Sequence, residues 1–321
     1  MKQLLKAIKD SHASLPQEAR GLPIIIAASG GLDSTVLLHG LYQLRQALPV
    51  LVVAHVNYGL RGKESDEDQA FTEQLCQLFS LRCFVLQKKI GTKANDLQNK
   101  ARKIRYDFFT KIASELKGAI IATAHQRDDQ VETFLLRLVQ GASSHGLGGM
   151  EEFSAGLWRP LLKCPRQALE KIAQENKIEF RTDSSNQTDK YLRNKIRQQL
   201  LPLLKTLNPR IEEHIAKTAT HLRSQAQWVM LMAEKFLTTH REKTGKGFSL
   251  PIIPLKEAPR ALRCQVLQQA WKELSNNLPL NSKKLAQLEQ AVLFPQKKRQ
   301  FIFKDPILIE QTRYRISFKN I

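Results

Sequence analysis

The stretch Ile24-Ile25-Ile26-Ala27-Ala28-Ser29-Gly30-Gly31-Leu32-Asp33-Ser34 decides the fold of this 321-residue sequence. It joins an apolar run of strand length, residues 22–28, to a segment with helical spacing, residues 37–47. Two glycines between a strand and a helix allow a tight turn whose backbone N–H groups approach a phosphate, and the helix N-terminus adds partial positive charge. The hydroxyl groups of Ser29 and Ser34 can donate further hydrogen bonds. The stretch therefore predicts a phosphate-binding turn.

Asp33 adds a carboxylate to this turn, where it would repel a bare phosphate. A magnesium ion between the two groups removes the repulsion, so the turn also predicts a Mg²⁺ site at Asp33. A nucleotide loop that ends in Lys-Ser/Thr and a GxGxxG dinucleotide turn are both absent from the sequence. The alternative interpretation is an ordinary strand–helix turn that is capped by Ser or Asp.

Strand-like and helix-like segments alternate through the first half of the chain. Apolar runs of strand length recur at residues 50–57, 82–87 and 119–123, and a helix-like segment follows each of them. Buried strands that alternate with helices indicate an α/β fold with a doubly wound parallel sheet, and ligands bind beyond the carboxyl ends of its strands. We therefore expect the loops after the first, second and fourth strands to open onto one crevice.

The second half of the sequence has a different character. Two long helix-like segments, residues 191–205 and 210–240, are separated by Leu207-Asn208-Pro209. We predict a nucleotide-binding domain over residues 1–206 and a mainly helical domain over residues 207–321. Shorter segments follow the long helices, with helices expected near 259–274 and 282–293 and short strands near 299–304 and 307–316.

Positive charge is the strongest signal in the composition. Lys and Arg number 50 and Asp and Glu 30, which gives a net charge of +20, and residues 201–321 alone carry 21 basic and 9 acidic side chains. This charge favours a polyanionic partner, nucleic acid first and an acidic membrane second. No apolar run approaches the length of about 20 residues that spans a membrane, and the N-terminus has the pattern of an amphipathic helix. We expect a cytoplasmic protein that does not enter a membrane.

The four cysteines argue against sulfur chemistry. No two of them have CxxC spacing, and none lies near a His in a metal-ligand pattern. Reduced thiols of a cytosolic protein are the simplest interpretation. The residues concerned are Cys76, Cys83, Cys164 and Cys264.

Further polar stretches accompany the phosphate turn along the chain: His55–Arg61, Ala101–Tyr106, Thr123–Thr133, Arg159–Leu162, and Asp183–Asn186 with Arg193–Arg197 behind it. The turn itself resembles the pyrophosphatase loop of the N-type ATP pyrophosphatases, the PP-loop superfamily with a HUP-like sheet. The full set, in this order over about residues 20–200, is similar to the tRNA(Ile)-lysidine synthetases. Two residues depart from the family pattern, because Tyr58 and Gln126 stand where its members often have His.

The resemblance implies a two-step ligation that uses ATP and Mg²⁺. The wobble cytidine of an isoleucine tRNA with a CAU anticodon attacks the α-phosphorus of ATP through its ring oxygen, and an adenylated tRNA and pyrophosphate form. The ε-amino group of free L-lysine then displaces AMP and becomes attached to position 2 of the base. The nucleotide-binding residues it implies are Ser29, Gly30, Gly31, Leu32, Asp33, Ser34, His55 and Asn57.

Several charged residues suit these steps. Asp33 with magnesium, and Arg105 from its helix, can neutralise the charge at the α-phosphorus during in-line attack. Asp129 and Glu132 are three residues apart and share a helix face, so they can hold the lysine ammonium or take its proton. The alternative for this acidic pair is capping of a helix N-terminus.

His125 follows a buried strand and can hydrogen-bond the nucleotide or the cytidine, or be a satisfied strand-end histidine. Arg193 and Arg197 are four residues apart on one helical face, which suits contact with phosphate or adenylate, or a solvated basic surface. The runs Lys283-Lys284 and Lys297-Lys298-Arg299 suit contact with the tRNA backbone.

Three other functions compete with this interpretation. A tRNA thiolase of the same superfamily would need a nucleophilic cysteine or a cluster. A small-metabolite synthetase would need an ammonia source and has no use for the positive charge. A tRNA-binding module without activity would not need Asp33 or the acidic pair. Longer members of the family carry an additional C-terminal domain that we do not expect in this sequence. The sequence is compatible with a homodimer but does not predict the oligomeric state.

Overall fold

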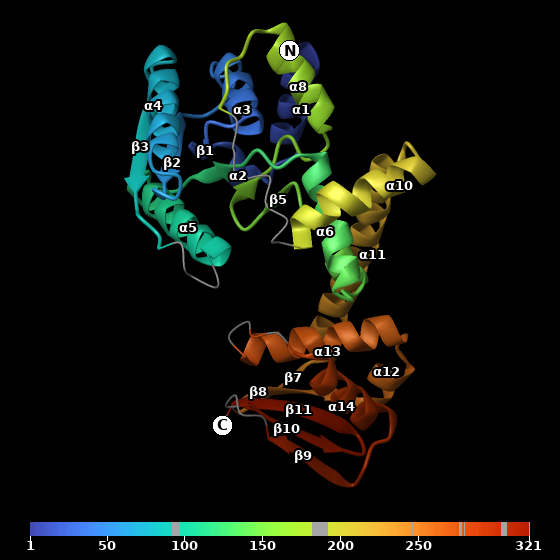
Figure 1. Cartoon of the computed structure of the whole chain (residues 1–321). Helices are drawn as coiled ribbons and strands as arrows, with labels where there is room; N and C mark the ends of the chain where they lie inside the picture. The colour runs from blue at the N-terminus through green and yellow to red at the C-terminus, as the bar shows by residue number, and fades with distance from the viewer. Residues whose placement is uncertain are drawn as a thin grey trace. The chain divides into compact units, whose positions relative to one another are not determined.

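The computed structural model describes residues 1–91, 97–181, 192–245, 247–275, 278, 280–302 and 307–320 (Figure 1). The stretch Asp183–Asn186 singled out from the sequence lies outside the described residues. The chain folds into two compact units, Met1–Ala219 and Thr220–Ile321. The sequence predicts this division after residue 206, which is earlier in the chain than the division after Ala219 in the structure.

The described residues of the first unit form a six-stranded sheet in the order β3-β2-β1-β4-β6-β5. β1 pairs in parallel with β2 on one side and with β4 on the other, and among the described strands of this sheet only the β5–β6 hairpin is antiparallel. The doubly wound α/β fold is therefore confirmed, with β1 at the position where the strand order reverses. The strands are β1 (Ile24–Ala27), β2 (Leu51–Asn57), β3 (Arg82–Gln87), β4 (Ile120–Ala122), β5 (Phe153–Ser154) and β6 (Leu157–Trp158).

Helices cover both faces of this sheet because successive side chains of β1 point to opposite faces. Ile24 and Ile26 pack with α1, α3 and α8, whereas Ile25 packs with Phe109 of α5, and all three isoleucines are fully buried. The helices of the unit are α1 (Lys2–Ala13), α2 (Gln17–Arg20), α3 (Leu32–Gln43), α4 (Lys63–Leu78), α5 (Leu97–Glu115), α6 (Arg127–Val139), α7 (Ser144–Leu147), α8 (Arg166–Glu175), α9 (Leu192–Lys195), a π-helical turn (Ile196–Leu200) and α10 (Leu201–Leu207).

The second unit joins helices to an antiparallel sheet in the order β7-β8-β11-β10-β9, as far as the structure describes it. The helix α11 (Ile211–His240) crosses the division between the units. Within the described residues, no helix is long and apolar enough to cross a membrane. The other elements are α12 (Ile252–Glu257), α13 (Arg260–Leu274), α14 (Ser282–Leu293), β7 (Glu242–Thr244), β8 (Gly247–Pro251), β9 (Lys298–Ile302), β10 (Ile307–Thr312) and β11 (Arg315–Asn320).

This second sheet is larger than the two strands that the sequence predicts. The expected strand at 307–316 contains a turn at Arg313 and Tyr314, so it is split into β10 and β11. Two further short strands, β7 and β8, pair ahead of α12. Gly247 is needed there because a Cβ at its position would lie only 2.0 Å from the carbonyl oxygen of Phe318 on the paired strand.

Candidate active site

The turn Ser29–Ser34 follows β1 directly and is built from hydrogen bonds within the turn. Gly30 has φ +81°, a left-handed conformation that favours glycine, and its carbonyl oxygen accepts a hydrogen bond from Thr35 Oγ1 at 3.1 Å. Ser34 Oγ donates to the Gly31 carbonyl at 3.0 Å and lies 3.0 Å from Ser29 Oγ.

The helix α3 begins at Leu32, immediately after the two glycines. Leu32 is buried and anchors the turn to the core. Among the described residues, no side chain caps this helix N-terminus, so its first N–H groups are available to an anion. The turn that the sequence predicts is therefore present, with a geometry suited to phosphate.

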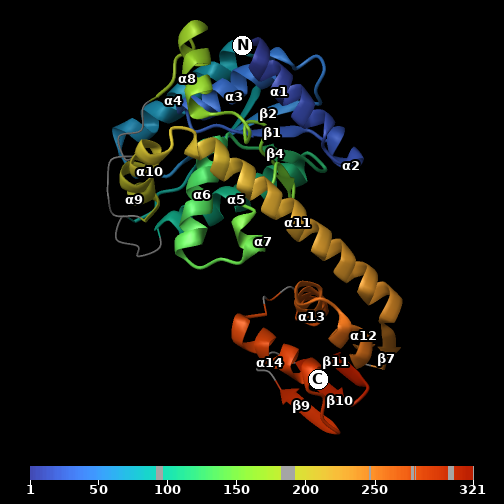
Figure 2. The same cartoon turned by 90° about the vertical axis from the view of Figure 1, so that its right-hand side faces the viewer.

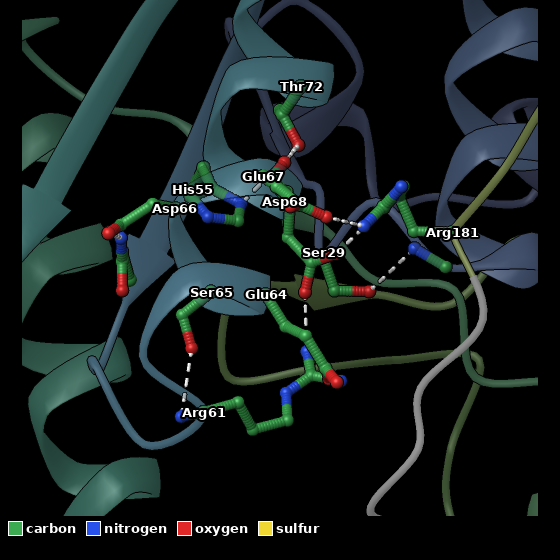
Figure 3. A network of polar contacts seen from close by, with 12 residues as sticks. Ser29, His55, Arg61, Glu64, Ser65, Asp66, Glu67, Asp68, Thr72 and Arg181 are labelled. Atoms are coloured by element: carbon green, nitrogen blue, oxygen red, sulfur yellow. Dashed lines mark hydrogen bonds and ion pairs between the residues drawn. The ribbon is translucent and has the colours of Figure 1, made fainter.

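Arg181 closes one side of the turn, although it lies far along the sequence (Figure 3). Its backbone N–H donates to the Gly30 carbonyl at 2.9 Å, and its guanidinium binds Glu67 and Asp68 on α4. Asp68 is buried and also binds Arg61, from the loop after β2. Sequence analysis missed Arg181, because only the folded chain brings it to the turn.

The end of β2 lies beside the same turn. His55 is buried, and its Nδ1 lies 3.0 Å from the Ala28 carbonyl, so Nδ1–H donates there. Its Nε2 is buried with no partner within the described structure, and burial lowers the pKa of this histidine. Asn57 instead shapes the following loop, where its amide donates to Asp66 at 2.9 Å and accepts from the Gly59 N–H at 2.9 Å.

Asp33 extends from the first turn of α3. Its Oδ1 is buried and has no hydrogen-bond partner among the described residues, and its Oδ2 lies 3.6 Å from Nη1 of Arg166. Burial raises the pKa of Asp33 to about 6 against the opposing charge of Arg166, and the charge of Asp129 raises it further. The carboxylates of Asp33 and Asp129 are therefore close enough to interact through their charges.

A buried carboxylate oxygen without a partner fits a hard divalent cation such as Mg²⁺. No group of three His, Cys, Asp or Glu side chains in the described part of the chain can hold a metal. Magnesium at Asp33 would therefore complete its coordination with phosphate oxygens and water, as it commonly does in nucleotide sites.

The helix α6 follows β4 and begins with a capping box. Gln126 accepts from the Asp128 N–H at 2.7 Å, and Asp129 Oδ2 accepts from the Gln126 N–H at 3.0 Å. Asp129 thus caps the helix, which is the alternative interpretation of the acidic pair, and its Oδ1 also accepts from Nη2 of Arg193 at 2.9 Å. Gln126, where the family often has His, supplies half of this cap.

The acidic pair and the arginine pair form one ion cluster. Glu132 is only 2% exposed, and it accepts from Nε of Arg193 at 2.7 Å and from Nε of Arg197 at 2.5 Å. Arg197 lies in the π-helical turn, a rare conformation that is frequent at functional sites. The structure therefore joins four residues that the sequence predicts as two separate pairs.

His125 lies between this cluster and the end of β4. Its Nδ1 is 2.9 Å from Thr123 Oγ1, and burial lowers its pKa to about 4. The charge of Asp129 opposes this shift, whereas Arg159 and Arg193 reinforce it. The imidazole is therefore neutral at pH 7 and can donate and accept hydrogen bonds without adding charge to the site.

His125→Gln is expected to change how stability depends on pH. The folded pKa of about 4 lies below the ordinary value of 6.5, so the unfolded chain takes up a proton first as the pH falls. The wild type should lose up to about 3 kcal/mol relative to the variant between pH 6.5 and 4. Asp33, whose folded pKa is raised, contributes with the opposite sign in this range, so only the difference between the two proteins isolates His125.

Urea unfolding of both proteins at several pH values measures this difference. His145→Gln is the control, because His145 is exposed on α7. Equal pH dependence of the wild type and the His125 variant would contradict the prediction.

Arg105 on α5 is held by Tyr58, one of the two residues that depart from the family pattern. Its Nε donates to the hydroxyl oxygen of Tyr58 at 3.1 Å, and that hydroxyl donates to the Ala101 carbonyl at 2.8 Å. Arg105 is exposed, and its role at the α-phosphorus stays a prediction. The neighbouring Arg102, which sequence analysis did not single out, contributes positive charge at His125.

Comparison with known proteins agrees with this geometry. Residues 2–204 match the family model of the PP-loop domain. The chain is 35% identical to the tRNA(Ile)-lysidine synthase of Geobacter sulfurreducens, over 83% of this chain and 58% of that protein. It is 31% identical to the tRNA(Ile)-lysidine synthase of Bacteroides thetaiotaomicron, over 94% and 68%.

A solved structure shares the fold at low sequence identity. A U34-tRNA thiolase from Methanococcus maripaludis, solved with its [4Fe-4S] cluster, aligns with TM-score 0.57 and 17% identity over 70% of this chain and 78% of that one. The sheet and its phosphate turn, together with the family match over residues 2–204, define a PP-loop domain. Within this class, the chain belongs to the tRNA(Ile)-lysidine synthase family. It spans 58% and 68% of the length of the two curated relatives.

Proposed function

We propose that this protein is an AMP-forming ligase that attaches L-lysine to the wobble cytidine of an isoleucine tRNA with a CAU anticodon, in the cytoplasm. One observation carries the proposal: the turn after β1 and the first turn of α6, which follows β4, meet at Arg166. The backbone N–H of Arg166 donates to Asp128 Oδ1 at 3.3 Å while its guanidinium lies 3.6 Å from Asp33. The phosphate-binding turn and the acidic pair thus lie at the same edge of the sheet.

In the first step, the turn binds the triphosphate of ATP through backbone N–H groups and the hydroxyls of Ser29 and Ser34. Magnesium bound at Asp33 would supply charge neutralisation at the phosphates. The ring oxygen of the cytidine attacks the α-phosphorus, the bond to the β-phosphate breaks, and pyrophosphate leaves. Arg105 and neutral His125 line the approach of the base.

In the second step, the ε-amino group of lysine attacks carbon 2 of the adenylated base and AMP leaves with the oxygen. Asp129 and Glu132 hold the ammonium group and take its proton before attack. In the structure Asp129 binds Arg193, and Glu132 binds both Arg193 and Arg197. The lysine ammonium therefore enters a site whose carboxylates already bind positively charged groups. The arginines are then free to contact the phosphate of the adenylate.

The RNA partner is supported by charge. The net charge of +20 suits a polyanion, and the basic runs Lys283-Lys284 and Lys297-Lys298-Arg299 lie at the start of α14 and of β9. Sulfur transfer is disfavoured, because no two of the four cysteines have the CxxC spacing of a cluster site.

Reconstitution with ATP, Mg²⁺, lysine and a transcript of the CAU isoleucine tRNA tests the proposal. AMP formation should require both lysine and this transcript, and labelled lysine should enter the RNA. Incorporation of sulfur instead of lysine would support the thiolase. Absence of salt-sensitive tRNA binding at low ionic strength would support a metabolite synthetase.

A further inference from the structure

Arg166 occupies a position that the catalytic roles described for the two steps do not use. It is the first residue of α8, and α8 packs alongside α3 through buried residues such as Leu169 (Figures 1 and 2). Its backbone N–H donates to Asp128, in the first turn of α6, and its side chain reaches Asp33, from the turn after β1. One residue thus contacts the segments that follow β1 and β4, the two strands between which the strand order reverses.

The guanidinium of Arg166 is held loosely. The side chain is 44% exposed, Nη1 lies 3.6 Å from Asp33 Oδ2, and Nε donates to Glu170 at 3.0 Å one helical turn away. Since the link to Asp33 is longer than a good hydrogen bond, the guanidinium can turn toward another anion without losing its anchor on Glu170.

Asp33 cannot bind Arg166 and a divalent cation equally well at the same time. A cation on the buried Oδ1 would stand close to the guanidinium, and like charges at that distance repel each other. A polyphosphate beside Asp33 offers oxygens whose geometry matches the planar fork of an arginine. The same nucleotide that brings the cation therefore provides Arg166 with a better partner.

We propose that Arg166 binds the pyrophosphate part of ATP. In the free protein, Arg166 is the counter-ion of Asp33. When nucleotide and metal bind, its guanidinium moves to the oxygens of the phosphates that later leave as pyrophosphate. This inference rests on the proposed function for the identity of the nucleotide, but it concerns a residue for which that function assigns no catalytic role.

Isothermal titration of Arg166→Ala with α,β-methylene-ATP, inorganic pyrophosphate and AMP, all with Mg²⁺, tests the assignment. Affinity for the first two ligands should fall about 10- to 100-fold, as expected for a lost charge-assisted hydrogen-bond pair, while affinity for AMP changes less than about two-fold. Arg166→Lys should restore part of the loss, because a lysine keeps the charge but not the fork.

Lys171→Ala is the matched control, because Lys171 lies on the same helix and pairs with Glu175 at 3.7 Å as Arg166 pairs with Glu170. It should leave all three affinities unchanged. An equal loss for AMP, or unchanged binding of pyrophosphate, would overturn the assignment. So would tighter Mn²⁺ binding by Arg166→Ala with no loss of nucleotide, which would mean that Arg166 only shields Asp33. Wild-type protein that binds no nucleotide would overturn the proposed function as well.

Discussion

Asp33→Asn is expected to lower pyrophosphate release by about 10²- to 10³-fold, the usual effect of removing one electrostatic contact to a transition state. The variant keeps the size of the side chain and removes its charge. Because Oδ1 of Asp33 has no protein partner among the described residues, the amide disturbs few existing contacts. Affinity for tRNA should stay within about two-fold of the wild type, because the proposed RNA contacts lie at other, basic residues.

A pyrophosphate assay and a filter-binding assay with the same tRNA, both at low ionic strength, separate these two effects. Asp107→Asn is the control, because Asp107 is an exposed carboxylate on α5. Persistent pyrophosphate release in Asp33→Asn would show that Asp33 does not hold the metal. Loss of tRNA binding together with activity would point to a damaged fold.

The first sheet and its turn are predictable because the signals are local. Residues 24–26 are three consecutive isoleucines, which only a strand covered on both faces can bury, and the glycines that follow fix the turn. The polar residues after β4 are predictable for the same reason, since parallel strands present their carboxyl ends at one edge.

The partners of these residues are not predictable from local patterns. The spacing of Asp129 and Glu132 indicates a shared helix face, but nothing near them in the sequence indicates that Arg193 and Arg197 fill that face. Arg166 reaches Asp33 through the packing of α8 against α3. The second sheet is larger than predicted for a different reason, because its strands are short and the turn at Tyr314 interrupts a continuous β pattern.

Glu132→Gln is expected to separate the two steps of the reaction. The carboxylate is 2% exposed and binds two arginines in the part of the site assigned to lysine. With the amide in place, kcat/KM for lysine should fall about 100-fold or more, because the ammonium loses a charged partner in a desolvated site. Pyrophosphate release in the first turnover should persist within about three-fold, and adenylated tRNA should accumulate.

The variant should still fold. Breaking a fully buried ion pair costs about 3–5 kcal/mol, but the side chains of Arg193 and Arg197 are 43% and 40% exposed and stay hydrated. We therefore expect a loss of only about 1–2 kcal/mol in unfolding free energy. Urea unfolding checks this value, and Glu175→Gln on the exposed face of α8 is the control.

Rapid-quench measurement of pyrophosphate and AMP in the same reaction then decides the role of Glu132. Unchanged dependence on lysine would exclude the acidic pair as the lysine site. An equal loss of the pyrophosphate burst and of AMP would mean that Glu132 acts in the first step, by positioning Arg193 and Arg197 for the nucleotide. Since Arg193 binds both Glu132 and Asp129, Asp129→Asn should then reproduce the loss of the burst. If Glu132 serves lysine, Asp129→Asn should instead raise KM for lysine and leave the burst in place.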